Sequence, residues 1–191
     1  MNDGRDESAR LFFFEGSQMG ITIVGLGPGD GRYLTRQAWQ ILSEADRVVV
    51  RTSRHPAIRD LPEGVEVVSF DHVYETSASF EEVYQTIVDA LLLMGQAAEA
   101  EGSDVCYAVP GHPLVGESTV TALLVEAHSA GVPVRVVDGL SFLEPTLSAL
   151  GQDAFDGLQL FDALEVAGYD HPPLNCDRPA LLGQVYDRLV A

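Results

Sequence analysis

The sequence contains no lysine, because all 11 basic residues among its 191 positions are arginines. A P-loop needs a lysine on the phosphates and Schiff-base chemistry needs a lysine amine, so both are excluded. Cysteine is nearly as scarce: Cys106 and Cys176 lie 70 residues apart, and neither belongs to a C-x-x-C pair. This spacing argues against a metal site or a disulfide framework and is typical of a cytoplasmic protein.

Long hydrophobic runs are also missing from the beginning of the chain. Residues 11–14 form the only apolar run before Met19. Four residues are too few for the core of a signal peptide or for a membrane span. Residues 1–19 are therefore interpreted as an extension whose composition is compatible with disorder.

Positive charge is scarce in the later part of the chain. The formal charge is −18, and residues 60–191 carry 3 arginines against 22 acidic residues, whereas residues 1–59 carry 8 against 7. Such an acidic surface repels nucleic acid and anionic membranes, so neither is expected as a partner.

What the chain does have is a glycine-rich turn between a strand pattern and a helix pattern. The β-branched residues 21–24 predict a short buried strand, and the apolar spacing of residues 34–45 predicts a helix. Between them, Gly25, Gly27 and Gly29 allow a sharp turn that we expect to leave backbone N–H groups bare for a ligand. Strand, glycine turn and helix together indicate a site for a nucleotide-like cofactor.

Strand and helix patterns alternate along most of the chain. This alternation, with 46% hydrophobic residues, predicts an α/β protein with a parallel sheet covered on both faces. The later strands are expected at 47–51, 65–70, 105–109, 132–137, 158–161 and 180–182, with a Pro-rich loop in 163–179. Further helices are expected at 80–100, 118–130 and 141–150, the first and last opened by capping boxes at Ser79 and Ser141, and a last one at the C-terminal end.

The glycine turn suits some cofactors better than others. A dinucleotide site needs G-x-G-x-x-G, but Asp30 takes the third glycine's place and would repel a pyrophosphate. An NAD site also needs an acid after the second strand, where this chain has Arg51. A ligand without phosphates fits better, and S-adenosylmethionine (SAM) is such a ligand.

Three separated motifs resemble those of the tetrapyrrole (corrin/porphyrin) methylase family. Residues 25–30 resemble its G-x-G-P-G-D signature, residues 109–113 its G-D-P loop, and residues 138–142 its P-G-x-S-S segment. Residues 109–117, 141–145 and 183–186 further resemble the YabN-like branch, which is fused to MazG-type nucleotide pyrophosphohydrolases. The resemblance runs from about Gly20 to the C-terminus.

The resemblance implies two α/β domains with SAM folded into the cleft between them. These would be an N-terminal domain of residues 20–140 and a partial, truncated second domain of residues 141–191. It implies a homodimer, no metal and a small-molecule acceptor of the tetrapyrrole class. The implied cofactor-binding residues are Gly27, Pro28, Gly111, His112, Leu114, Ser141, Phe142, Leu182 and Gly183, and the substrate-facing candidates are Asp30, Arg51 and His112.

Each charged candidate also has a simpler interpretation. Asp30 is equally placed to cap the following helix. His112, which replaces the family's Asp, is equally placed to act as a turn residue. Arg51 suits either a substrate carboxylate or a surface ion pair. Glu117 is interpreted as a partner of a helix N-terminal dipole.

Two functions therefore remain open. The first is a SAM-dependent methyltransferase with an unknown acceptor, which needs little acid–base machinery because the sulfonium already carries an activated methyl group. The alternative is a non-catalytic ligand-binding or dimerisation module, normally fused to a MazG-type hydrolase. The hydrolase is not expected within this chain, which has no E-x-x-E and E-x-x-D helix pair.

Overall fold

A computed structural model describes residues 20–185 of the chain. The extension predicted at 1–19 and the helix predicted at the C-terminal end lie outside the described residues. Backbone contacts divide the chain into two compact units, Met1–Ser141 and Phe142–Ala191, and each is described by itself. No helix in the described range is long and apolar enough to cross a membrane.

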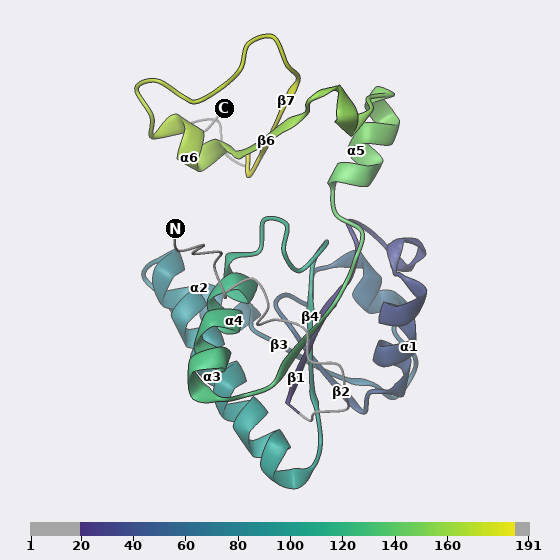
Figure 1. The fold of residues 1–191 in the computed structure, drawn as a ribbon. Coiled ribbons are helices and arrows are strands. Elements are labelled where there is room, and N and C mark those ends of the chain that lie inside the picture. The colour runs from purple at the N-terminus through teal and green to yellow at the C-terminus, as the bar shows by residue number, and fades with distance from the viewer. Residues whose placement is uncertain (1–19, 186–191) are drawn as a thin grey trace, which may run out of the picture. The chain divides into compact units, whose positions relative to one another are not determined.

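The first unit is built on a five-stranded parallel sheet (Figure 1). Its strand order is β3-β2-β4-β1-β5, and every neighbouring pair runs parallel. The predicted α/β class with a parallel sheet is therefore confirmed. The strands are β1 (Ile21–Gly25), β2 (Arg47–Val50), β3 (Glu66–Ser69), β4 (Val105–Val109) and β5 (Val134–Val137).

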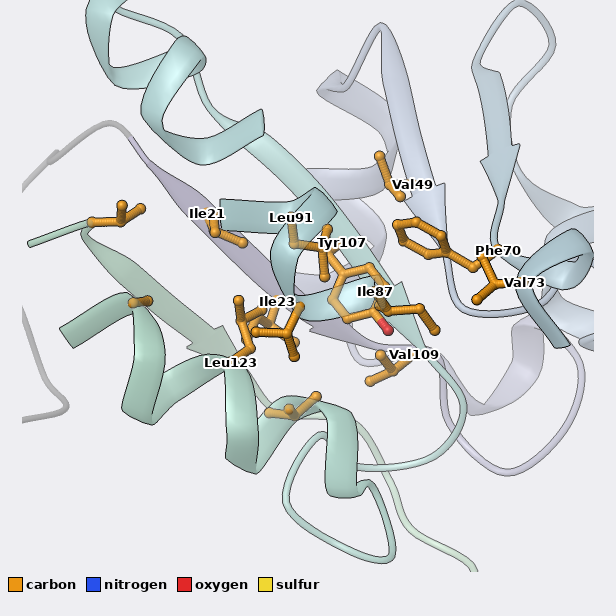
Figure 2. Packing of buried hydrophobic residues seen from close by; sticks show 14 of the residues in the cluster. Ile21, Ile23, Val49, Phe70, Val73, Ile87, Leu91, Tyr107, Val109 and Leu123 are labelled. Carbon is orange, nitrogen blue, oxygen red and sulfur yellow. The ribbon is translucent and has the colours of Figure 1, made fainter. Parts of the chain in front are cut away.

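Helices cover both faces of this sheet, which explains why its central strands are apolar throughout. Alternate residues of each strand enter different cores, so Ile21 and Ile23 face one side and Val24 the other. The larger core packs under α2 (Asp71–Thr76), α3 (Phe80–Glu101) and α4 (Ser118–Ala130), and the Tyr107 ring lies within it (Figure 2). The smaller core packs under α1 (Arg36–Glu44) and the 3-10 helix η3 (Pro56–Asp60).

Helix ends follow the capping residues in the sequence. Thr35 and Ser79 accept hydrogen bonds at the N-termini of α1 and α3, from Ala38 and Glu82. The Glu82 carboxylate accepts a bond from the N–H of Ala78, one residue before the N-cap, so the Ser79 cap is confirmed and the return bond of the predicted capping box is shifted by one residue. Left-handed Gly102 and Gly131 end α3 and α4.

Three local predictions need correction. No helix was expected between the strand at 65–70 and the helix at 80–100, but Asp71 begins α2, which the pattern missed because the helix has only six residues. The N-cap position of α5 (Leu143–Leu150) falls on Phe142 rather than on Ser141, and the Phe142 side chain makes no capping bond. The stretch after residue 162 begins with a short helix, α6 (Ala163–Ala167), rather than with a loop.

The second unit is small and lightly packed. Its strands β6 (Gln159–Asp162) and β7 (Ala180–Gly183) pair in parallel, with α6 following β6. Two further 3-10 helices complete the described part of the chain: η2 (Gly31–Tyr33) in the first unit and η4 (Ala154–Asp156) in the second. Most buried apolar residues belong to the first unit, and the second contributes Ala163.

Candidate functional site

The candidate site lies at the carboxyl ends of the central strands. Strand β1 has β4 on one side and β5 on the other, so the loops that leave these three strands meet at one edge of the sheet. In open parallel sheets this is the edge where ligands bind. These loops are residues 26–30, 110–117 and 138–141.

The first two loops are joined by their backbones. Gly27 and Gly111 exchange two hydrogen bonds, of 3.1 Å from the N–H of Gly27 and 2.8 Å from the N–H of Gly111. The N–H of Leu26 also donates to the carbonyl of Val109 at 2.8 Å. Gly27 and Gly111 both have left-handed φ angles, of 76° and 69°, which glycine adopts without strain.

The third loop closes against the first two without room for a side chain. A Cβ atom at Gly25 would lie 2.6 Å from the backbone nitrogen of Gly139 and 2.7 Å from the carbonyl oxygen of Gly111. A Cβ at Gly139 would also collide with that same oxygen. By contrast, nothing lies within 4 Å of a Cβ at Gly111, so the space beside this residue is open to a ligand.

The expectation of bare N–H groups in the glycine turn is wrong for Leu26 and Gly27. The N–H groups of Leu26 and Gly27 donate to the loop after β4, and the N–H of Gly31 donates to the Asp60 carboxylate at 2.7 Å. The sequence could not show this, because the acceptors come from loops far along the chain. The start of the turn, at Leu26 and Gly27, is thus fixed by the end of β4 and the loop after it.

His112 bridges two of the loops. Its Nδ1 accepts from the N–H of Leu114 at 3.0 Å, which is the turn role considered from the sequence. Its Nε2 lies 3.5 Å from an Asp138 carboxylate oxygen. Asp138, which sequence reasoning did not select, therefore supplies a carboxylate next to the position where the family's own Asp is missing.

Asp30 adopts the capping geometry that was its simpler interpretation. Its carboxylate accepts from the N–H of Arg32 at the start of η2 and pairs with the Arg32 guanidinium at 2.8 Å. These bonds hold the pKa of Asp30 below its ordinary value of 3.8. The carboxylate also borders an open depression of about 530 Å³, which is lined by Asp30, Gly31, Arg32, Trp39 and Asp60.

Arg51 forms an ion pair, but a largely buried one. Its Nη1 lies 2.6 Å from a Glu117 oxygen, and the exposed fractions of the two side chains are 30% and 3%. Burial raises the pKa of Glu117 although Arg51 opposes this. Burial would lower the pKa of Arg51, yet the charge of Glu117 contributes to a net rise. Glu117 occupies the N-cap position of α4, so the pair ties the end of loop 110–117 to the end of β2.

His55 is a supporting residue that sequence reasoning assigned no role in the site. The side chain is buried, its Nδ1 accepts from the N–H of Ala57 at 3.3 Å, and it hydrogen-bonds the backbone of Gly27. Burial lowers its pKa, which favours the neutral ring that this pair of bonds requires. The only signal in the sequence was a histidine directly before Pro56.

The remaining cofactor candidates divide between the two units. In the first unit, Pro28 adjoins Gly27, Leu114 is exposed, and Ser141 is buried. In the second unit, a Cβ at Gly183 would lie 3.4 Å from the Phe142 ring, so these two candidates meet although 41 positions separate them. Leu182 is exposed on β7.

Comparison with known proteins identifies the family of the chain. Residues 20–175 match the family model described as tetrapyrrole (corrin/porphyrin) methylases, so the chain is a member of that family. It is 40% identical over 172 residues to the uncharacterized protein YabN of Bacillus subtilis (strain 168). This match covers 90% of the chain but 34% of YabN, so the chain spans about a third of that relative's length.

Solved structures share the fold. The uroporphyrin-III C-methyltransferase of Thermus thermophilus superposes with a TM-score of 0.61 at 24% identity, covering 85% of this chain and 67% of its own. The cobalt precorrin-4 methyltransferase CbiF gives 0.53 at 21% identity, covering 87% and 65%. A diphthine synthase gives 0.52 at 24% identity, covering 74% and 53%. The names of these proteins differ in the compound that each acts on or makes, so the shared fold leaves the acceptor open.

Proposed function

We propose that the chain binds SAM at the carboxyl edge of the five-stranded sheet and takes part in methyl transfer. The observation that carries this proposal is the backbone pairing of Gly27 with Gly111, closed from behind by Gly25 and Gly139. It gives a rigid surface without side chains, next to open space, in a member of a methylase family. The cofactor-binding residues proposed in this unit are Gly27, Pro28, Gly111, His112, Leu114 and Ser141, and those proposed in the second unit are Phe142, Leu182 and Gly183.

The charges around this edge favour a ligand without phosphates. Asp30, Asp60 and Asp138 place three carboxylates on the loops at or near the site. The nearby guanidinium groups of Arg32 and Arg51 are already paired with carboxylates. Phosphates would be repelled, whereas the positive sulfonium of SAM would be attracted.

The residues of the chain would act mainly by binding and orienting. When bound, SAM supplies an activated methyl group, so the protein needs to align the acceptor and exclude water. The glycine surface would fix the cofactor, and His112 with Asp138 would present a hydrogen-bonding group beside it. Asp30 and Arg51 are the other substrate-facing residues in this proposal. Each is now paired within the protein, Asp30 with Arg32 and Arg51 with Glu117.

The acceptor that fits the family is a small molecule of the tetrapyrrole class. The uroporphyrin-III and cobalt precorrin-4 enzymes share the fold, and their names describe such acceptors. We leave the particular tetrapyrrole open, because the family's Asp is replaced by His112.

A second function is favoured by His112 in place of the family's Asp, and by the ion pairs that Asp30 and Arg51 form within the protein. Asp30 and Arg51 already have protein partners, and the chain matches a third of YabN. A non-catalytic module that binds the cofactor or forms a homodimer, attached to a MazG-type hydrolase, would need no free substrate-facing charge.

Transfer of a labelled methyl group separates the two functions. The chain is incubated with methyl-labelled SAM and a reduced porphyrinogen, and the label in the tetrapyrrole is measured. Binding with transfer supports the methyltransferase, and binding without transfer to any tetrapyrrole supports the module. Absence of SAM binding contradicts the methyltransferase and the cofactor assignment, and leaves only a module that forms a homodimer.

A further inference from the structure

A cluster of buried polar side chains lies behind the candidate site. It consists of Arg51 at the end of β2, Tyr74 on α2, Tyr107 on β4 and Glu117 at the start of α4, and we name it the Arg51 cluster. Its members influence one another: Glu117 and Arg51 contribute, after burial, to the raised pKa values of both Tyr74 and Tyr107. The cluster is therefore one electrostatic unit that joins four elements.

Each member of the Arg51 cluster has a buried polar atom without a partner in the described part of the protein. These atoms are the Nε of Arg51, the hydroxyls of Tyr74 and Tyr107, and the Oε1 of Glu117. The buried hydroxyl of Thr119 is a fifth such atom, and it neighbours the Glu117 carboxylate. Tyr107 is fully buried, and its ring is held within the larger apolar core (Figure 2). Buried polar atoms without partners are destabilising and uncommon in native proteins, so four in one place indicate a bound partner.

The chemistry of these four atoms selects the partner. The Nε–H of Arg51 only donates, the Glu117 oxygen only accepts, and the tyrosine hydroxyls do either. A carboxylate or phosphate would be repelled by Glu117, and a cation would be repelled by Arg51. Water donates and accepts, and it is bound in protein interiors where two to four polar groups converge.

We propose that the Arg51 cluster is a buried binding site for ordered water, which links β2 and β4 to the end of loop 110–117. This loop carries Gly111 and His112, so the water completes the anchor that the Arg51–Glu117 pair begins. The inference concerns the interior behind the loop and stands whether or not SAM is the cofactor.

A crystal structure of the whole chain at high resolution tests the site directly. We expect at least one ordered water within hydrogen-bonding distance of two or more of the four atoms. A dry cluster, or side chains that bond one another directly, would overturn the proposal.

Tyr107→Phe provides a second, independent test, because it removes the hydroxyl and keeps the ring. If water bonds this hydroxyl, the variant loses a hydrogen bond and its Tm falls by about 2–4 °C. If the hydroxyl has no partner, its removal leaves Tm unchanged or raises it, which would refute the proposal. Tyr169→Phe is the matched control, because that hydroxyl is in an exposed pair with Glu165 and its loss is expected to leave Tm unchanged.

Discussion

Gly25 shows how a single absent methyl group decides the geometry of the site. The residue ends β1, and its Cα faces the backbones of two other loops at distances that leave no space for a Cβ. The glycines of residues 25–30 are thus required for close packing as well as for the turn. Gly27 and Gly111 need glycine for their φ angles, whereas Gly25 and Gly139 need it for close approach.

Gly25→Ala is expected to separate the three loops. The new Cβ meets backbone atoms, which cannot move aside cheaply, so overpacking costs about 1–3 kcal/mol of unfolding free energy. The variant should also lose binding of S-adenosylhomocysteine, measured by calorimetry. Gly102→Ala is the control: its φ of 68° produces strain, but nothing lies near its Cβ and it lies at the amino end of β4. If Gly25→Ala binds as well as the control, the packing argument is wrong.

Asp71 is expected to make stability depend on pH. Partial burial alone would raise its pKa, but hydrogen bonds from Ser53, Thr52 and Ser69 hold it far below the ordinary 3.8. The unfolded chain then binds more protons, so this stabilisation is fully present above about pH 5, begins to fall near the unfolded pKa of 3.8 and is completely lost only below the lower folded pKa.

The check is urea unfolding of the wild type and Asp71→Asn at pH 7 and pH 3. The difference in unfolding free energy between the wild type and the variant should be smaller at pH 3 than at pH 7. We expect a decrease of about 1 kcal/mol, since the site is partly exposed. An equal difference at both values would contradict the assignment.

At the scale of elements, the loop after β4 is fixed at both ends by groups of different kinds. Its start pairs with the glycine turn through Gly111, and its end is held to β2 by Glu117 and Arg51. The sequence interpretation of Arg51 as part of a surface ion pair is right about the ion pair, but the pair with Glu117 is largely buried. Burial of Glu117 makes the pair sensitive to loss of one partner.

Glu117→Ala should therefore lower the unfolding free energy by about 2–3 kcal/mol, because it leaves the charge of the Arg51 guanidinium without a partner, although this group is still partly hydrated. Glu66→Ala is the matched control, since Glu66 of β3 pairs with Arg47 of β2 at 2.8 Å but both side chains are well exposed. That variant should cost less than about 1 kcal/mol. Equal costs in urea unfolding would show that burial does not distinguish the two pairs.

Helix α3 begins after the N-cap Ser79, which the sequence predicted and the structure confirms. Ser79→Ala removes the hydroxyl that accepts from the N–H of Glu82, so we expect a loss of about 1 kcal/mol in urea unfolding. Ser43→Ala, in the last turn of α1, removes a hydroxyl that bonds the Trp39 carbonyl and caps nothing. The control should lose nothing, and a comparable loss in both variants would argue against the cap.

At the scale of the whole molecule, periodicity predicted the first unit well. The strand at 105–109 and the helix at 118–130 agree with β4 and α4, because long apolar patterns record burial directly. Short helices such as α2 and α6 were missed, since five or six residues carry too little pattern.

The site was less predictable than the fold. The motifs located the three loops, but Asp138, Gly139 and His55 acquire their roles only when distant segments meet. The same is true of the N–H donors in and just after the glycine turn, whose acceptors lie at the end of β4, in the loop after it and at the end of η3. A pattern in sequence can show a residue's type and spacing but not its partner across a sheet.

The central claim is that the glycine surface binds SAM rather than a phosphate-bearing nucleotide. Calorimetric titration of the chain with S-adenosylhomocysteine, and separately with NADH and with ATP, tests this most directly. We predict saturable binding of one S-adenosylhomocysteine per chain and no heat from NADH or ATP, because the carboxylates around the site repel phosphates. No binding of S-adenosylhomocysteine, or binding of NADH with equal affinity, would contradict the account.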